Sequence, residues 1–338
     1  MQRSGILCAG AWCIDRNIAL DHWPQEEMLG RVLDESNEGG CPGHNMSTAL
    51  KRLGAAFPVS AMGLIGDDED GRHLIQICDE MGIERSTLEM RSNVATCHTM
   101  AMTAQDTGKR TFFYSAGAHA IQCPDDFDFA KTTARIVHMG LPGLHEKLDH
   151  AWKDDVSGWV TVLKNARAAG LKPNIELVSV EPEAIRAAAL PMLPFLDTLI
   201  INDYEAAAIS GVETIVNGVT EASACRKAAE VLMERTNLSL AAVHFPMGGV
   251  VLARDGSVAE HPSVNVPAIA IAGNNGAGDA FAAGMLFGHH EGWPLEKSLR
   301  LAHASAAASL RAKSTTTSIE NSQDCLALAE HWGWRTST

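Results

Sequence analysis

The sequence predicts an α/β protein in which helices cover a mainly parallel sheet, with a small separate β-sheet serving as a lid. Three observations support this fold class. Short apolar runs typical of buried strands alternate with longer runs typical of helices along most of the chain. Two glycine-rich turns lead into helices, at 38–45 and 271–279. Two other segments, 16–38 and 98–113, lack a helical period and are interpreted as strands of the lid.

The strands and helices of the main domain are placed by their apolar patterns and by the glycines that flank them. Buried strands are expected at 5–11, 58–66, 135–140, 173–178, 198–202 and 240–245, followed by a hairpin at 249–253 and 257–261. Helices are expected at 46–54, 72–81, 150–169, 181–189, 205–210, 220–235, 280–287 and 295–312. This alternation predicts a parallel, doubly wound sheet within a single domain that spans residues 1–338.

The lid is expected to comprise residues from about 13–40 and 96–118. In the second segment, two strand-like runs at 98–104 and 110–114 flank the turn signal Gln-Asp-Thr-Gly-Lys, which predicts a hairpin. Such a sheet would exclude water from a bound substrate. Its apolar face would be exposed in a monomer, so we expect a homodimer that forms through the lid.

Composition and charge exclude several classes of function. Apolar residues make up 46% of the 338 residues and charged residues 20%, an ordinary balance for a globular protein. The formal charge of −14, with no block of Lys or Arg, argues against nucleic acid and anionic membranes as partners. An apolar run of about 18 residues, as a membrane span requires, does not occur.

Cysteine usage and the N-terminal residues indicate a cytoplasmic protein. The eight cysteines contain no C-x-x-C pair, so we interpret them as reduced thiols and expect no zinc site. The apolar run within residues 1–10 is shorter than the h-region of a secretory signal. We interpret these residues as leading into the first strand.

The glycine-rich stretch at 271–284 carries the candidate catalytic residues. Gly276, Ala277 and Gly278 open a helix, where unpaired backbone N–H groups and the helix dipole favour an anion such as phosphate. Asp279 follows at the helix start. Phosphoryl transfer to an alcohol needs a carboxylate beside a phosphate site, because the hydroxyl must lose its proton. The alternative is a glycine-rich loop in which Asp279 only caps the helix.

A second glycine-rich turn carries the candidate substrate-binding residues. Gly39 and Gly40 precede a helix, and Asn45 lies near the start of that helix, where its amide could both donate and accept hydrogen bonds with sugar hydroxyls. Asp15 follows the first strand, at the edge where α/β sheets place ligand contacts. The alternative is a plain turn with a helix cap.

Four motifs along the chain, taken together, resemble the ribokinase-like carbohydrate kinases, the PfkB family. The resemblance covers nearly the whole chain. In order, the motifs are Gly39-Gly40 … Asn45 … Ala49-Leu50 … Leu53-Gly54 with Gly63-x-x-Gly66-Asp67-Asp68-x-x-Gly71, then Asn202-Asp203-Tyr204-Glu205, then Gly276-Ala277-Gly278-Asp279-x-Phe281-x-x-Gly284, and Ala302-His303-Ala304-x-Ala306-Ala307-Ala308.

The resemblance implies a three-layer sandwich of helices on a mainly parallel sheet, with a β-lid over the sugar, and it implies ATP and Mg²⁺ as cofactors. It implies that Asp279 is the base and that the backbone of 275–278 is the anion hole. The residues implied to bind substrate are Asp15, Gly39, Gly40 and Asn45. Those implied to bind nucleotide are Asn202, Gly249, Asn275, Gly276, Gly278 and His303. Those implied to act on Mg²⁺, through water, are Asn202 and Glu205.

Three segments depart from the family pattern. Gly273-Asn274-Asn275 stands where the family has D-T-x, and 312–314 lacks the usual glycine, so we doubt activation by a monovalent cation in its standard form. In the nucleotide loop, 244–249, only Gly249 fits the family pattern cleanly, and Pro246 removes a backbone donor.

The function predicted from these observations is ATP-dependent phosphorylation of a hydroxyl of a sugar, ribose- or fructose-like. With Arg110 as the one basic residue of interest in the lid, a neutral acceptor is preferred over a sugar phosphate. Two alternatives stay open: an adenosine-like nucleoside kinase, for which Trp12, Trp23 and Phe113 could face the base, and a non-catalytic sugar or nucleotide sensor.

Overall fold

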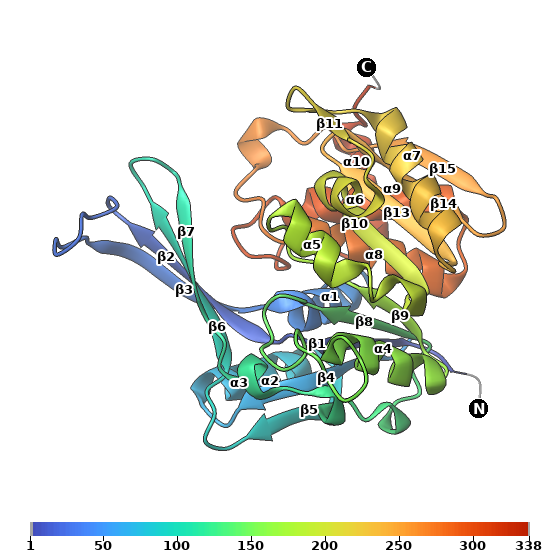
Figure 1. The fold of residues 1–338 in the computed structure, drawn as a ribbon. Helices are drawn as coiled ribbons and strands as arrows, with labels where there is room; N and C mark the ends of the chain where they lie inside the picture. Colours follow the sequence, from blue (N-terminus) through green and yellow to red (C-terminus); the bar gives the residue numbers. More distant parts are fainter. Residues whose placement is uncertain (1–2, 337–338) are drawn as a thin grey trace.

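A nine-stranded sheet forms the centre of the protein, which is represented by a computed structural model that describes residues 3–336 (Figure 1). The strand order is β15-β14-β13-β10-β9-β8-β1-β4-β5, and every neighbouring pair from β13 to β5 is parallel. β14 and β15 add an antiparallel edge. The strands are β1 (Ile6–Gly10), β4 (Val59–Gly66), β5 (Glu84–Arg91), β8 (Ile136–Gly140), β9 (Lys172–Ile175), β10 (Thr198–Asn202), β13 (Leu240–Phe245), β14 (Gly248–Ala253) and β15 (Val258–Pro262).

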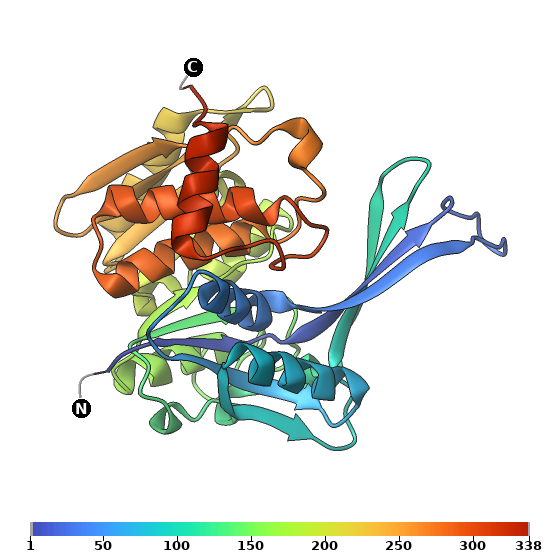
Figure 2. The same cartoon turned by 180° about the vertical axis from the view of Figure 1, so that it is seen from behind.

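Helices cover both faces of this sheet and form two separate apolar cores. One face packs against α1 (Cys41–Arg52), α2 (Glu69–Met81), α8 (Ala277–Glu291), α9 (Leu295–Ser309) and α10 (Ser322–Trp332), which lie in front in Figure 2. The other face packs against α4 (Gly158–Ala168), α5 (Pro182–Ala189), α6 (Asp203–Ser210) and α7 (Ala222–Arg235). Strands such as β4 are buried along their whole length, because a parallel sheet with two covered faces excludes water from both. The predicted mainly parallel α/β sandwich is therefore confirmed.

A second, four-stranded sheet projects from the main domain (Figure 1). Its order is β3-β2-β6-β7, formed by β2 (Cys13–Leu20), β3 (Val32–Gly40), β6 (Cys97–Ala104) and β7 (Arg110–Ser115). We call this sheet, together with the segments that join β2 to β3 and β6 to β7, the lid. β2 leaves the main domain two residues after β1 ends, and β3 runs directly into α1. The first glycine turn thus lies where the lid joins the main sheet.

Several boundaries differ from those expected, for local physical reasons. α2 begins at Glu69 instead of residue 72, because the Asp68 side chain accepts from the Gly71 backbone N–H at 2.8 Å and caps the helix. α4 begins at Gly158 instead of residue 150, because Ser157 caps it by accepting from Val160 N–H. The acidic run at 67–70 is therefore a helix cap and first turn.

Some elements were not predicted at all. β5 is an edge strand whose residues alternate between exposed and partly buried, so it carries no apolar run, and α10 follows the last helix expected. Among the helices of residues 3–336, none combines the length and the apolar character needed to cross a bilayer.

Candidate active site

The turn before α8 presents backbone N–H groups that have no partner within the helix. Gly276 has a φ of 76°, and a Cβ placed on it would lie 2.6 Å from the Cβ of Thr315, so the position requires glycine. No side chain caps α8. The backbone N–H groups of Ala277, Gly278 and Asp279, in the first turn, precede the first intrahelical bond, in which Ala280 N–H donates to the Gly276 carbonyl at 2.9 Å. These N–H groups and the helix dipole can bind a phosphoryl group.

Asp279 is held by the second glycine motif, which is 234 residues away in the sequence. The Asn45 Nδ2 amide donates to Asp279 Oδ2 at 2.6 Å. On its other side, Asn45 Oδ1 accepts from the Thr315 hydroxyl at 2.9 Å, which fixes the orientation of the amide. Asn45 lies inside α1 and not at its start, since that helix begins at Cys41. The structure therefore brings the predicted base and a predicted substrate residue together.

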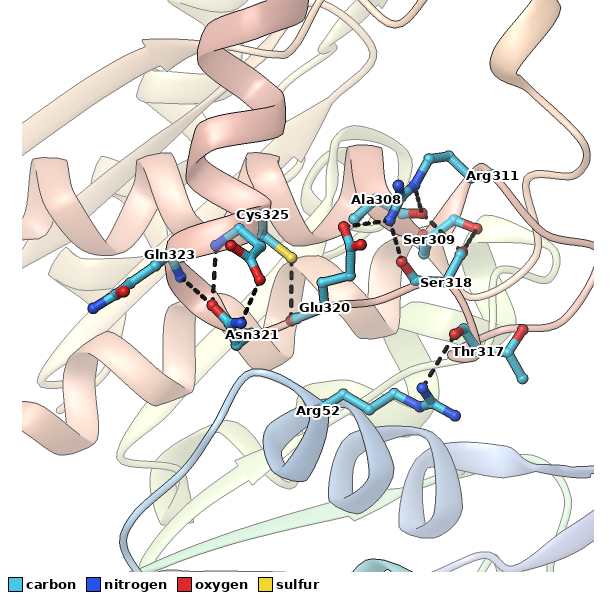
Figure 3. Close-up of polar contacts among 11 residues, drawn as sticks. Arg52, Ala308, Ser309, Arg311, Thr317, Ser318, Glu320, Asn321, Gln323 and Cys325 are labelled. Atoms are coloured by element: carbon cyan, nitrogen blue, oxygen red, sulfur yellow. Dashed lines mark hydrogen bonds and ion pairs between the residues drawn. The ribbon is translucent and has the colours of Figure 1, made fainter.

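The loop that carries Thr315 is fixed by its own polar contacts, which Figure 3 displays. Arg52 of α1 donates to the Thr317 carbonyl at 3.1 Å, and Arg311 forms a 2.8 Å ion pair with Glu320. The Ser318 hydroxyl donates to a carbonyl at the end of α9 at 2.8 Å. These contacts make the 311–320 loop a firm support for the Asn45 amide.

Gly39 and Gly40 allow close approach at the base of the lid. A Cβ on Gly40 would lie 2.4 Å from Asp15 Oδ2, and a Cβ on Gly39 would lie 2.2 Å from the His44 ring. The Asp15 carboxylate, which accepts from the Cys13 thiol at 3.6 Å, therefore packs directly over the glycine backbone. Burial raises the pKa of Asp15 to about 6, and nearby carboxylates, including Asp279, act in the same direction.

A cavity of about 460 Å³ lies next to the first turn of α8. Asn202, Gly278 and His303, all predicted nucleotide residues, line this cavity, and its size is that of a small-molecule site. His303 is 4% exposed, its Nε2 has no hydrogen-bond partner within residues 3–336, and burial lowers its pKa to about 3. Gly249 lies behind the His303 ring, where a Cβ would be 3.2 Å from Nε2, and it lines a neighbouring cavity instead.

Asn202 and Glu205 form a reciprocal cap at the start of α6. Asn202 Oδ1 accepts from Glu205 N–H at 2.8 Å, and Glu205 Oε2 accepts from Asn202 N–H at 3.2 Å. Ser179 donates to the other carboxylate oxygen of Glu205 at 2.8 Å. With both oxygens engaged and the residue 6% exposed, Glu205 does not fit direct coordination of a metal. In residues 3–336 no group of three or more acidic, His or Cys side chains is arranged to hold an ion.

The segments that depart from the family pattern lie at the turn before α8 and at the 460 Å³ cavity. A Cβ on Gly273 would lie 3.1 Å from the Ala312 carbonyl and 3.8 Å from Nη2 of Arg110, so the lid arginine reaches the turn before α8. The two segments 273–275 and 312–314 are thus neighbours in space. In the other divergent segment, His244 and Pro246 line the 460 Å³ cavity.

Glu176 and His138 were not predicted as site residues. Glu176 directly follows β9, and its carboxylate lies close enough to that of Asp279 for each to affect the pKa of the other. His138 Nε2 lies 3.2 Å from Glu176 Oε2. The position of Glu176, one residue past a buried parallel strand, is the signal that could have identified it. Burial, followed by the Glu176 carboxylate, raises the pKa of Asp279.

The comparisons with known proteins identify the family and agree with the fold. The family described as pfkB family carbohydrate kinase matches residues 4–322, and the chain therefore belongs to that family of kinases. Among solved structures, Arabidopsis thaliana ribokinase complexed with ribose and ATP has a TM-score of 0.75 at 20% identity, covering 98% of this chain and 99% of that chain.

Two further structures have the same fold. Cryptococcus neoformans ribokinase in complex with ADP has a TM-score of 0.73 at 18% identity, covering 96% of this chain and 99% of that chain. Burkholderia thailandensis nucleoside kinase in complex with inosine has a TM-score of 0.71 at 17% identity, covering 98% of this chain and 100% of that chain. At these identities the likeness concerns the fold, and it spans structures that contain different small molecules, ribose in one and inosine in another.

Proposed function

We propose that this protein is an ATP-dependent phosphotransferase that phosphorylates a hydroxyl of a ribose- or fructose-like sugar. The observation that carries the proposal is the position of Asp279, which lies in the first turn of α8 beside free backbone N–H groups and is hydrogen-bonded to Asn45. A base and an anion site within one helical turn are what the transfer of a phosphoryl group to an alcohol requires.

Each residue has a defined task in this proposal. Asp15 and Asn45 hold the hydroxyls of the sugar over the Gly39-Gly40 backbone, and Asp279 accepts the proton of the attacking hydroxyl. The backbone of 275–278 stabilises the charge on the transferred group. Arg110, which lies near Gly273, would contact the transferred phosphoryl group as well. Because Arg110 is then engaged by that group, we propose that the acceptor carries no charge of its own.

ATP would occupy the 460 Å³ cavity, with its phosphates toward the first turn of α8. The ATP and ADP complexes of the Arabidopsis and Cryptococcus enzymes support this choice of nucleotide. Mg²⁺ would arrive with the phosphates and supply positive charge. Because Glu205 is already hydrogen-bonded, Asn202 and Glu205 would act on it only through water. We do not expect a monovalent cation to activate the enzyme in the standard form of the family.

The test of this function is an ADP-release assay over a panel of sugars and nucleosides, run with Asp279→Asn as the matched variant. We expect turnover with a sugar and a loss of about 100-fold or more in kcat for Asp279→Asn, with ATP binding retained. Full activity in the variant would show that Asp279 is not the base.

A nucleoside acceptor is the second candidate, favoured by the inosine complex of the Burkholderia enzyme. Trp12 does not support it, because it is completely buried and its Nε1 donates to the Met62 carbonyl. Trp23 and Phe113 are stacked on each other on the lid, with centroids 6.2 Å apart, and could face a base. In thermal-shift measurements, stabilisation by adenosine or inosine but not by ribose would decide for this candidate. Ligand binding without ADP release would instead decide for a sensor.

The assembly and location of the protein are also proposals. Leu29 is 91% exposed and Phe112 is 59% exposed, both on the lid, so the homodimer expected from the sequence would bury them. We retain the cytoplasmic location, which rests on cysteine usage.

A further inference from the structure

Three buried polar side chains lie side by side across the middle of the main sheet. His138 of β8 and Asn174 of β9 are register partners, and Asn174 is also the partner of Thr198 of β10. Their exposures are 1%, 0% and 1%, so water does not reach them. Since a buried polar group is costly unless it is hydrogen-bonded, their placement in an otherwise apolar sheet calls for a physical explanation.

The hydrogen bonds of this row run in one direction. The Thr198 hydroxyl donates to Asn174 Oδ1 at 3.1 Å, and Asn174 Nδ2 donates to His138 Nδ1 at 2.8 Å. His138 Nδ1 is therefore an acceptor, and burial keeps the ring neutral by lowering its pKa to about 4. The remaining proton must be on Nε2, which donates to Glu176 Oε2 at 3.2 Å.

Glu176 ends the row and presents its carboxylate to Asp279. Each carboxylate affects the pKa of the other, and the Asn45 amide donates to Asp279 Oδ2 at 2.6 Å. Asp15 from β2 and Glu205 from α6 add further negative charge around the pair. Two carboxylates in contact hold protons more tightly than either alone, because both cannot be charged without repulsion.

We propose that Glu176 is a positioning residue that makes Asp279 a stronger base by holding a second carboxylate against it, and that the Thr198–Asn174–His138 row fixes Glu176 in that position. The inference rests on the proposed phosphotransferase function. In the transfer step the O–H bond of the acceptor breaks and its proton passes to Asp279, where the O–H group that forms is shared with Glu176. The hydroxyl oxygen bonds to the γ-phosphorus, the bond from that phosphorus to the bridging oxygen breaks, and its electron pair leaves with ADP. The proton goes to solvent on product release.

The kinetic test compares the pH dependence of kcat/KM in Glu176→Gln, His138→Leu and His138→Gln. In Glu176→Gln the amide replaces a neighbouring charge with a donor, so Asp279 holds its proton less tightly. We expect the acid limb to move to lower pH by about one unit or more, with kcat reduced about tenfold and sugar KM changed less than about threefold.

His138→Leu should move the acid limb in the same direction but by less, because it removes the N–H that stabilises the charged form of Glu176 and so favours the uncharged carboxyl beside Asp279. His138→Gln, which restores a donor, should return the limb toward the wild-type position. The matched control is His290→Gln. His290 is also buried, but its Nε2 accepts from Gly5 N–H at the amino end of β1, so this variant should leave the profile unchanged. Losses of kcat in Glu176→Gln and His138→Leu with no shift of the acid limb would overturn the proposal in favour of a purely structural role.

A second measurement does not depend on turnover. Carboxyl ¹³C NMR titration should show Asp279 of the wild type releasing its proton at a higher pH than Asp279 of Glu176→Gln, and ¹⁵N NMR should place the His138 proton on Nε2. If no acceptor is phosphorylated but these signals are found, the function is wrong and the carboxylate pair stands. If turnover is found and the two titrations coincide, the pair is wrong and the function stands.

Discussion

Among the single residues of the site, Asp15 is a carboxylate whose charged form is disfavoured by folding. Its pKa in the folded protein, about 6, lies above the value near 4 expected for an unfolded chain. The folded state therefore binds more protons between these two values, and stability falls as pH rises through that window. At pH 7 the cost is roughly 1–2 kcal/mol after allowance for partial exposure.

Asp15→Asn should consequently unfold at a higher urea concentration than the wild type at pH 7, and the difference should disappear near pH 4. Sugar binding should weaken at the same time. Asp79→Asn is the control, since hydrogen bonding to Arg85 lowers the pKa of Asp79, and this variant should not gain stability at pH 7. A stability gain that is the same at both pH values would contradict the ionisation argument.

The identities of the site residues were more predictable than their contacts. Asp279 and Asn45 were selected because glycine turns before helices are local patterns. The bond between them joins positions 234 residues apart, and it depends on the order of the strands. Glu176 escaped prediction because the strand expected at 173–178 contained it, whereas β9 ends at Ile175 and leaves Glu176 at the edge of the sheet.

At the scale of a helix, α8 has a glycine with left-handed backbone conformation at each end, and the two glycines differ in the space available for a side chain. Gly276 has a φ of 76° and backbone of the Thr315 loop within 2.8 Å of a Cβ, whereas Gly292 has a φ of 67° and nothing within 4 Å. Gly276→Ala must therefore displace the support of Asn45, while Gly292→Ala adds only the strain of its backbone conformation.

We expect Gly292→Ala to cost about 1 kcal/mol of unfolding free energy with kcat nearly unchanged. Gly276→Ala should cost more than that and reduce kcat about 100-fold, since the anion site and the base both move. Urea denaturation and ADP release measure the two effects. Similar kcat values for the two variants would show that the turn does not hold the phosphoryl group.

The existence of most elements could be predicted because strands buried on both faces are continuously apolar, as in β4 and β8. Prediction failed where burial is one-sided or partial. β5 has an alternating, mainly polar sequence, and the start of α4 depends on one serine cap that no apolar period marks. The α/β class could therefore be predicted from the apolar character of the strands and their alternation with helices. The ends of the helices could not, because they depend on side-chain hydrogen bonds.

For the whole molecule, the lid is the part whose surface is least compatible with a monomer. Leu29 and Phe112 are exposed on it by 91% and 59%, away from the main sheet. A second copy of the lid would remove this surface from water, and burial of apolar area is the main driving force for such association.

We therefore expect light scattering to give a dimer mass at micromolar concentration. Leu29→Asp and Phe112→Asp should each give a monomer. Val258→Asp is the control, because Val258 is 43% exposed but lies on β15, at the edge of the main sheet. The Val258→Asp variant should remain dimeric. If the wild-type protein is a monomer, or if Val258→Asp alone dissociates the dimer, the lid is not the interface.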